Sequence, residues 1–298
     1  MTPDVRMGFF AGISAYFMWG VMPIYFKFIQ HIAPTDILGY RILWSIPTGM
    51  LLLAIAGRLR DLPVVFRSRN ALWLMASSFV IGLNWLIYIW AVNNAHIMQA
   101  SLGYFMNPLV NVGIGAIFLS ERLRPLQWGA VAIAATGVAI ETFVLGELPW
   151  VSLVLCFSFA FYGLIRRRVQ VDSRVGLTAE VLILLPAVLI WFAATSGQDR
   201  AFMGEGLRDF LVLALAGPVS AIPLILFALG AKRLRFSTIG IMQYLAPSLQ
   251  FLTGLGFGET LTPTRLITFA FIWTALVIFT LDALGHERQM RRAAMRPT

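Results

Sequence analysis

The sequence predicts an all-α integral membrane protein with ten transmembrane helices in two inverted five-helix repeats. The first observation is composition: 59% of the 298 residues are hydrophobic and only 12% are charged, whereas soluble domains carry about 25% charged residues. The second is the length of the apolar runs, because a helix needs roughly 20 apolar residues to cross a bilayer. The third is a pattern of small, aromatic and proline residues that recurs in both halves of the chain.

The apolar runs predict ten spans. Several begin beside a proline or a hydroxyl residue, as at Pro125 and Pro263, because the first turn of a helix does not need the missing N–H. We place the spans at residues 7–28, 35–57, 70–93, 96–119, 126–143, 149–168, 177–196, 210–231, 236–257 and 264–284. The whole chain, 1–298, is treated as one membrane domain, with a first repeat at 7–145, a second at 149–285 and a basic cytoplasmic tail at 286–298.

The basic residues predict the orientation. With the N-terminus in the cytoplasm, 18 of the 23 Lys and Arg residues fall in segments on the cytoplasmic side, where such residues are enriched in membrane proteins. An even number of spans then places the C-terminus there as well. This clustering explains the net charge of +9 without nucleic acid. The expected partners are the lipid bilayer and a small-molecule substrate, with the chain as a monomer or a homodimer.

Cysteine usage and motif content argue against cofactor chemistry. The single cysteine, Cys156, lies inside an apolar run, so neither a disulfide framework nor a cysteine-based metal site is expected. The sequence contains no HExxH or GxSxG motif, which are signatures of metal-dependent and serine hydrolases. We therefore expect no cofactor, no metal and no catalytic residue. The N-terminal apolar run lacks a small-residue cleavage motif, so we interpret it as a retained first helix.

The two halves of the chain share a motif at identical spacing. The residues WAV at 90–92 and ASLG at 100–103 match FAL at 227–229 and STIG at 237–240. Each half holds five predicted spans, an odd number, so the second half must enter the membrane from the opposite side. Inverted repeats of this kind place two equivalent half-sites at the bilayer centre, which is the geometric basis of alternating access.

Proline lies near the middle of the fourth and ninth predicted spans. Pro108 and Pro247 follow an aromatic residue by three positions in both copies. Each lacks an N–H, and each ring clashes with the carbonyl four residues earlier, so we expect both helices to be broken at mid-span, with Pro223 as a further break. A freed carbonyl is tolerated in the membrane only where it faces protein or a water-filled cavity. The breaks therefore predict a paired central site.

Five runs of sequence resemble one family of membrane proteins. They are AYFMWGVMPIYFK at 15–27, NWLIYIWAVNN at 84–94, ASLGYFMNPLVN at 100–111, FSFAFYGLIR at 157–166 and FAFIWTALVIF at 269–279. On these runs the chain resembles the EamA branch of the drug/metabolite transporter superfamily, and most closely its RarD-type permeases. The resemblance covers nearly the whole chain. It implies ten helices in two inverted repeats and transport of small metabolites across the bacterial inner membrane, as in YddG-like amino-acid exporters.

Polar and aromatic residues near the span centres are the candidate substrate contacts. Tyrosine and tryptophan prefer the membrane interface, and at mid-membrane they need a partner for their O–H or N–H. Each one could also serve helix packing alone, since polar side chains often bridge neighbouring membrane helices. The candidates for substrate binding are Tyr16, Trp19, Asn84, Tyr88, Tyr104, Phe105, Asn107, Asn111, Ser158, Tyr162, Gln243 and Tyr244, with Ser220 and Gln250 as further polar residues at span centres.

No Asp, Glu, Lys, Arg or His lies at the centre of a predicted span. Charge there is costly and marks proton relays or ion sites, so its absence favours a neutral or zwitterionic substrate and downhill transport. Glu121 and Glu259, at matching helix ends, are expected to pair with loop arginines. Lys27 and Arg41 lie toward the outer ends of the first two spans, where long side chains reach the interface. We interpret both as interface anchors, Arg41 with Asp36 nearby, or alternatively as a gate or a binding point for a substrate carboxylate.

The leading hypothesis is an exporter of small neutral or zwitterionic metabolites, with aromatic or large apolar amino acids as favoured substrates. A permease for another small organic solute, such as an antibiotic or a sugar-like compound, is the alternative in the same class. Among other classes of protein, a membrane-embedded enzyme is disfavoured because the sequence contains no catalytic motif. A sensor or assembly factor would have to contact its partner through the short cytoplasmic loops and the C-terminal tail, which are too short to form a domain.

Overall fold

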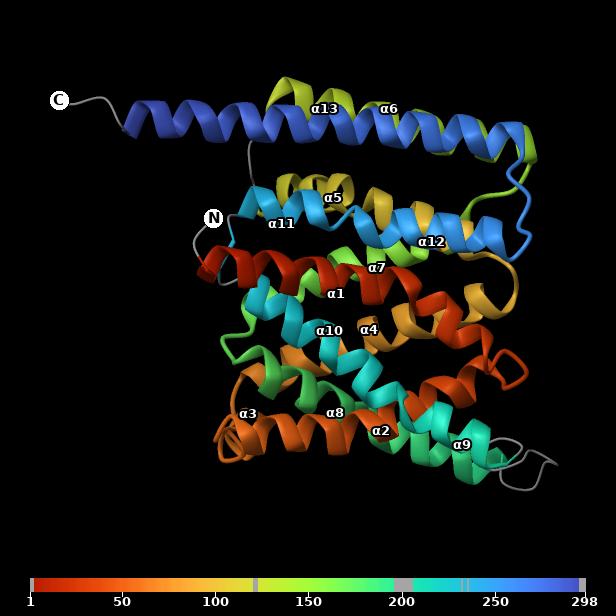
Figure 1. Ribbon diagram of the computed structural model, residues 1–298, viewed down its shortest axis with the longest axis vertical. Coiled ribbons are helices and arrows are strands. Elements are labelled where there is room, and N and C mark those ends of the chain that lie inside the picture. The colour runs from red at the N-terminus through yellow and green to blue at the C-terminus, as the bar shows by residue number, and fades with distance from the viewer. Residues whose placement is uncertain (1–2, 120–122, 196–205, 232, 235, 295–298) are drawn as a thin grey trace.

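The computed structural model describes residues 3–119, 123–195, 206–231, 233–234 and 236–294. Every regular element within these segments is a helix. The helices are α1 (Pro3–Lys27), α2 (Pro34–Ile55), α3 (Asp61–Phe66), α4 (Asn70–Asn93), α5 (Ile97–Leu119), α6 (Pro125–Leu145), α7 (Trp150–Arg168), α8 (Ser173–Thr195), α9 (Leu207–Ala214), α10 (Ala216–Ala231), α11 (Phe236–Met242), α12 (Leu245–Gly256) and α13 (Pro263–Ala294). Most of them run along a common direction as a bundle (Figure 1).

Eight helical segments of the described chain are long and apolar enough to cross a membrane. They are Pro3–Lys27, Pro34–Ile55, Asn70–Asn93, Ile97–Phe118, Pro125–Leu145, Ser173–Thr195, Leu207–Ala231 and Pro263–His286. This confirms the predicted multi-pass α-helical membrane fold. Of the other two predicted spans, 149–168 corresponds to α7, whose apolar part is shorter, and 236–257 is divided between α11 and α12.

The prolines interrupt the helices less often than the sequence predicted. α5 continues through Pro108 and α10 continues through Pro223, so these two expected breaks are wrong. A proline inside a helix removes one backbone hydrogen bond, and the helix can bend there without ending. The break in the second copy falls at Gln243 and Tyr244, between α11 and α12. Pro247 follows in the first turn of α12, where its missing N–H has no partner to lose.

α8 begins at Ser173, one turn before its predicted start. Asp172 precedes the helix, and its Oδ1 accepts a hydrogen bond from the backbone N–H of Arg174 at 3.0 Å. Hydrogen bonds from the Arg174 side chain lower the pKa of the Asp172 carboxyl to about 2. The carboxylate is therefore ionised at neutral pH, and a negative charge stabilises the N-terminus of a helix. The added turn places Glu180 deeper in the bundle than the sequence indicated.

Helices from the two halves of the chain pack against one another. α13 packs along α6, α12 along α5, and α2 along α8. Between these pairs, α1 packs against α10 and α12, while α7 packs against α4 and α5; α10 also contacts α2, and α4 contacts α8. In Figure 1 the pair α6 and α13 forms the upper edge of the bundle, and α2 and α8 form the lower edge. The interior therefore lies among α1, α4, α7 and α10.

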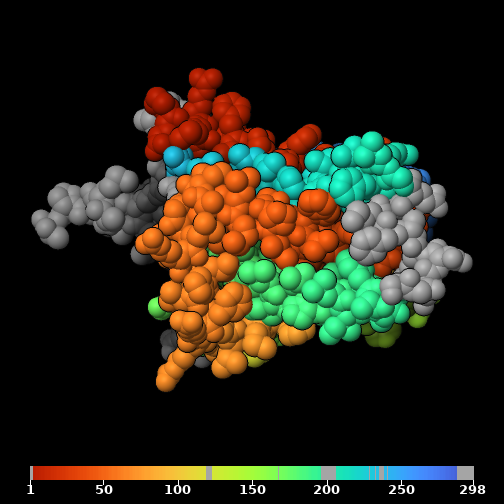
Figure 2. Space-filling model, turned by 90° about the horizontal axis from the view of Figure 1, so that it is seen from below, coloured from red at the N-terminus to blue at the C-terminus, as the bar shows by residue number. Residues whose placement is uncertain are grey.

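The start of α1 and the end of α13 lie at the same end of the bundle (Figure 1). The short helix α3, which the sequence did not predict, lies at that end as well, whereas α9 lies at the opposite end. Figure 2 shows the face at the lower edge of Figure 1, where the orange residues of the α2 and α3 region lie beside the green residues of α8. α13 continues to Ala294, so the first part of the basic tail extends this helix.

Candidate functional site

Arg41 is a charged side chain in the interior of the bundle. It is the eighth residue of α2 and only 6% exposed. Its Nε donates a hydrogen bond to Ser220 Oγ on α10 at 3.0 Å. The guanidinium carbon lies 4.2 Å from the ring centre of Trp85 on α4 and 5.9 Å from that of Phe26 on α1. The expectation that Arg41 anchors the outer interface is therefore wrong, because the surrounding helices enclose the side chain before it can reach the helix end.

A close contact between α2 and α10 brings Ser220 to Arg41. Gly217 lies one turn before Ser220, and a Cβ at this position would lie 2.5 Å from Thr48 Oγ1 and closer still to the carbonyl oxygen of Trp44. Only glycine allows the two backbones to approach this closely. The hydrogen bond between Arg41 and Ser220 therefore depends on glycine at position 217, which lets α2 and α10 approach each other.

Tyrosine residues surround the guanidinium. Tyr88 is 4% exposed, and its ring centre lies 6.0 Å from that of Phe26 and 5.7 Å from that of Tyr104. The hydroxyl groups of Tyr25, Tyr88 and Tyr104 are near enough to interact electrostatically with Arg41. Tyr25 donates its hydroxyl hydrogen to a backbone carbonyl on α9, whereas the buried Tyr88 hydroxyl has no hydrogen-bond partner among the described residues.

Asn84 connects these aromatic rings to the second half of the chain. Its Nδ2 donates hydrogen bonds to Ser158 Oγ at 2.9 Å and to the carbonyl oxygen of Leu155 at 3.0 Å, both on α7. Its Oδ1 accepts a long hydrogen bond of 3.4 Å from the Tyr104 hydroxyl. The predicted residues Asn84, Tyr88, Tyr104 and Ser158 thus form one connected group beside Arg41. We call these five residues the Arg41 group.

Tyr16 and Trp19 form a second aromatic group with α10 and α12. Their ring centres lie 5.4 Å apart, and the ring of Phe227 lies 5.9 Å from Tyr16 and 5.8 Å from Trp19. Gln250 Nε2 donates a hydrogen bond to the Trp19 carbonyl oxygen at 3.1 Å. The Gln250 Oε1 is buried and has no partner in the described part of the chain. This group also joins the first half of the chain to the second.

Other predicted residues lie elsewhere. Phe105 packs against Phe269 and Trp273 of α13, and Tyr244 packs into the same apolar cluster. Asn111 is exposed, Gln243 is half-buried, and Asn107 is buried with its Oδ1 unpaired. The sequence placed all of them near span centres, but depth in the membrane does not determine which neighbour a helix face meets.

Glu180 is a buried carboxylate that the sequence reasoning missed. It is 0% exposed and accepts hydrogen bonds from Ser77 Oγ on α4 at 2.5 Å and from the Tyr162 hydroxyl on α7 at 3.2 Å. Arg166 Nη1 lies 3.6 Å from Glu180 Oε1. A Cβ at Gly176 would collide with the Arg166 guanidinium, so glycine there allows the pair to form. The sequence placed no charge at a span centre, yet Arg41 and Glu180 are both buried inside the bundle. The arguments that missing charge gave for downhill transport and for the charge of the substrate therefore no longer hold.

Helix position is the signal that could have located both charges. Counted from the helix starts at Pro34 and Ser173, Arg41 and Glu180 are each the eighth residue of their helix. Arg41 donates a hydrogen bond to Ser220 and Glu180 accepts one from Ser77, and in both cases the serine lies on a helix from the other half of the chain. The two helices occupy equivalent places in the two predicted repeats. The start of α8 had to be known before this correspondence could be seen.

Glu259 caps the start of α5, and its ion pair with a loop arginine, expected from the sequence, is not found among the described residues. Its two carboxylate oxygens accept hydrogen bonds from the backbone N–H groups of Ile97 at 2.6 Å and Met98 at 2.8 Å. The first N–H groups of a helix have no partner within the helix, and negative charge is favourable there. Glu121, its match in the first half, lies outside the described residues.

We expect Glu259→Ala to lower the free energy of unfolding by about 1 kcal/mol, the usual cost of losing a helix cap. Thermal unfolding in detergent, followed by tryptophan fluorescence, measures the change. Glu147→Ala, at an exposed position between α6 and α7, is the control and should unfold like the wild type. Equal melting temperatures for Glu259→Ala and this control would contradict the capping role.

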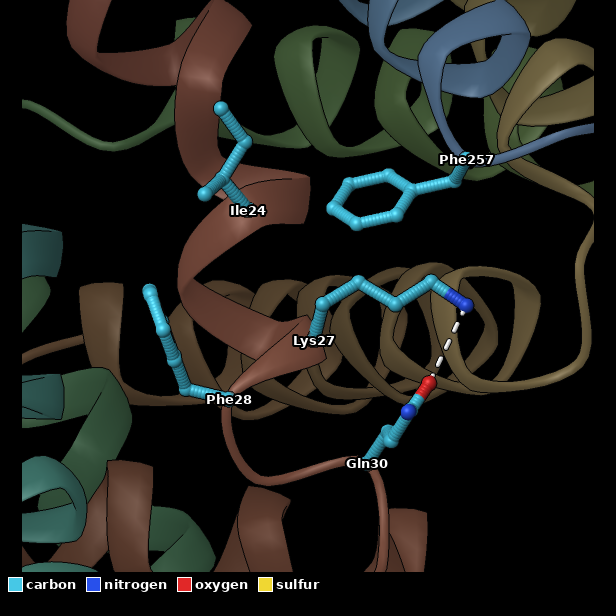
Figure 3. A pocket seen from close by; sticks show the side chains of 5 residues that line it. All are labelled: Ile24, Lys27, Phe28, Gln30 and Phe257. Carbon is cyan, nitrogen blue, oxygen red and sulfur yellow. Dashed lines mark hydrogen bonds between the residues drawn. The ribbon is translucent and has the colours of Figure 1, made fainter.

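A surface pocket of about 380 Å³ lies at the end of α1 and is shown in Figure 3. Lys27 Nζ donates a hydrogen bond to Gln30 Oε1 at 3.2 Å and lies 5.5 Å from the ring centre of Phe257. Ile24 and Phe28 complete the lining. Lys27 therefore lies at the helix end, as the sequence predicted, and apart from the Arg41 group.

Comparison with known proteins identifies the family. The sequence profile of the EamA-like transporter family matches residues 6–143. An uncharacterized transporter of Vibrio cholerae is 46% identical over 98% of this chain and 99% of its own length. The RarD protein of Escherichia coli is 42% identical over 96% of this chain and 98% of its own. The chain belongs to the EamA-like transporter family.

Within the EamA-like transporters, the full-length match to RarD proteins makes this chain a RarD-type permease of the drug/metabolite transporter superfamily. A Pseudomonas aeruginosa protein named chloramphenicol-sensitive protein RarD is 32% identical over 96% of this chain and 97% of its own length. A crystal structure that is 20% identical in sequence covers 93% of this chain and 98% of its own, with a TM-score of 0.61. That similarity supports the fold alone.

Proposed function

We propose that this EamA-like transporter exports small neutral or zwitterionic metabolites, amino acids foremost, by alternating access between two inverted five-helix halves. The observation that carries the proposal is that the buried polar and aromatic residues lie where the two halves meet. Arg41 bonds to Ser220, Asn84 to Ser158, and Gln250 to the Trp19 backbone, each across the two halves. Because these residues are buried, a solute can reach them only when the helices around them move apart.

The packing of the helices supports an inverted repeat. Exchange of the halves pairs α1 with α7, α2 with α8, α4 with α10, α5 with α12, and α6 with α13. Under this exchange the contact of α1 with α10 becomes that of α7 with α4, and the contact of α1 with α12 becomes that of α7 with α5. The contacts α2 with α8, α5 with α12 and α6 with α13 map onto themselves. Together with α7 and α11–α12, the eight apolar segments then make ten spans.

The distribution of basic residues supports cytoplasmic termini in the bacterial inner membrane. The start of α1, the end of α13 and the short helix α3 lie at one end of the bundle (Figure 1). Arg58, Arg60, Arg67 and Arg69 flank α3, and Lys and Arg concentrate on the cytoplasmic side of membrane proteins. Attaching a reporter enzyme to the C-terminus tests this orientation. Activity of a periplasm-dependent reporter such as alkaline phosphatase would contradict it.

Counterflow tests the transport function itself. Proteoliposomes of the purified protein are loaded with one unlabelled amino acid at a time, and uptake of the same labelled amino acid is followed. We expect accumulation for at least one aromatic or large apolar amino acid, and none in protein-free liposomes. Absence of exchange for every amino acid and for chloramphenicol would overturn the proposal and favour a sensor or an enzyme.

A second candidate substrate class is an antibiotic. The Pseudomonas aeruginosa relative is named a chloramphenicol-sensitive protein. Labelled chloramphenicol therefore belongs in the same counterflow panel. Exchange of chloramphenicol without exchange of any amino acid would replace the favoured substrate class while retaining the transport function.

A further inference from the structure

Arg41 is a buried cation for which the described part of the chain supplies no carboxylate within ion-pair distance. The ion pairs between described residues do not include it. A charge inside a membrane protein normally has an opposite charge or marks a substrate path. We propose that Arg41 binds the carboxylate group of the transported solute. This inference rests on the proposed transport function and names the charged group that the substrate carries.

The Arg41 guanidinium uses its Nε for a hydrogen bond within the protein but does not use its two terminal nitrogens in hydrogen bonds to described residues. Nε is engaged by Ser220 Oγ, whose own hydroxyl hydrogen is donated to the Ala216 carbonyl oxygen at 2.7 Å. The hydrogen bonds of Arg41 to described residues do not involve the two terminal nitrogens. Arginine binds a carboxylate through two parallel N–H groups. Ser220 therefore orients the guanidinium, and the two terminal nitrogens can bind such a ligand once the surrounding helices move apart.

The Tyr88 hydroxyl is a second, independent indication of a ligand. It is buried without a partner and lies near enough to Arg41 to interact with it electrostatically. A buried hydroxyl without a partner is destabilising, so its retention beside an uncompensated cation is explained if both groups bind one anion. A carboxylate has enough acceptor sites for both.

The surroundings favour a compact organic acid over inorganic phosphate. Four aromatic rings, those of Phe26, Trp85, Tyr88 and Tyr104, lie around the guanidinium, and no second described arginine or lysine shares the site. A doubly charged phosphate would keep one uncompensated negative charge, because Arg41 supplies only one positive charge. An aromatic or large apolar amino acid places one carboxylate on Arg41 and its apolar body against the rings.

Carboxylate dependence is tested first on the unmodified protein. Thermal stabilisation in detergent is measured with phenylalanine, tyrosine, tryptophan, leucine and methionine, with the five matching carboxamides, and with inorganic phosphate. We expect at least one acid to raise the melting temperature in a saturable way, while its carboxamide at equal concentration does not. The proposal is overturned if none of the acids binds, if acid and carboxamide bind equally, or if phosphate alone binds.

Variants then assign the effect to Arg41. For the acid that binds, Arg41→Met and Arg41→Lys should each weaken binding by about 10- to 100-fold, the usual effect of losing a charge-assisted hydrogen-bonded pair. Arg60→Met, an exposed cytoplasmic-end position, is the matched control. Tyr88→Phe should weaken binding by about 2- to 10-fold without lowering the melting temperature of the ligand-free protein. Unchanged acid binding in Arg41→Met or Tyr88→Phe would refute the assignment.

The counterflow assay separates failure of this inference from failure of the proposed function. If an uncharged solute such as chloramphenicol exchanges equally well in the wild type and in Arg41→Met, the protein is a transporter but Arg41 is not its carboxylate site. If neither protein exchanges any solute, the transport function itself fails.

Discussion

Gly217→Ala is expected to lower the free energy of unfolding by about 1–3 kcal/mol, the range for overpacking a tight contact, and to reduce solute exchange strongly. The added Cβ meets the Trp44 carbonyl oxygen and Thr48 Oγ1. A backbone carbonyl inside a helix cannot rotate away, so α10 has to move outward from α2. That movement separates Ser220 from Arg41, whose Nε–Oγ distance is 3.0 Å. Thermal unfolding and counterflow on the same preparation measure both effects.

Gly129→Ala is the matched control for this substitution. Gly129 lies in α6, and a Cβ there would meet no heavy atom within 4 Å. Alanine is favoured over glycine inside a helix by about 0.5–1 kcal/mol, so this variant should be as stable as the wild type or slightly more stable. If both variants behave alike, the close approach of α2 and α10 does not determine stability or transport.

Glu180→Gln is expected to lower the free energy of unfolding by about 3 kcal/mol, because removal of one partner leaves the other as an uncompensated buried charge. Glutamine retains the shape of the side chain, but its single carbonyl oxygen can replace only one of the two carboxylate oxygens that accept from Ser77 and Tyr162. The variant therefore removes the charge opposite Arg166 together with one accepted hydrogen bond. Unfolding of detergent-solubilised protein by increasing sodium dodecyl sulfate measures the change. Asp61→Asn is the control, since its pair with Arg58 is about half exposed and should contribute less than about 1 kcal/mol.

A double mutant tests the role of Gly176 in the same pair. A Cβ at Gly176 displaces the Arg166 guanidinium, so Gly176→Ala should lose much of what Glu180→Gln loses. The combined variant should then be clearly more stable than the sum of the two single effects predicts, because residues that share one interaction are not additive. Simple additivity would show that the glycine acts independently of the Arg166–Glu180 pair.

Composition and hydropathy determined the membrane fold. Each predicted span corresponds to a helix, or to a pair of short helices, of the described chain, because a run of roughly 20 apolar residues can satisfy its backbone in lipid only as a helix. The repeated residues and the odd number of spans per half, on which the prediction of an inverted repeat rests, are likewise properties of the sequence.

Local backbone geometry was less predictable. Pro108 and Pro247 occupy matching places in the sequence, yet α5 continues through the first while a new helix begins just before the second. A proline weakens a helix at a known place, but the packing around it decides between a bend and a break. The start of α8 likewise depended on the cap formed by Asp172 and Arg174.

The roles of the charged residues were decided by the tertiary structure. The predicted spans placed Arg41, Glu180 and Glu259 near helix ends. Roles were predicted there for Arg41 and Glu259, whereas Glu180 received none because it lay far from a span centre. The structure instead places Arg41 against Trp85 and Ser220, Glu180 against Ser77 and Tyr162, and Glu259 at the start of α5. Hydropathy along the chain was enough to identify the segments that enter the membrane, because that property belongs to each segment alone. The partners of a buried charge could be identified only in the folded protein, because they come from helices that are distant in the chain and meet the charge at the same depth.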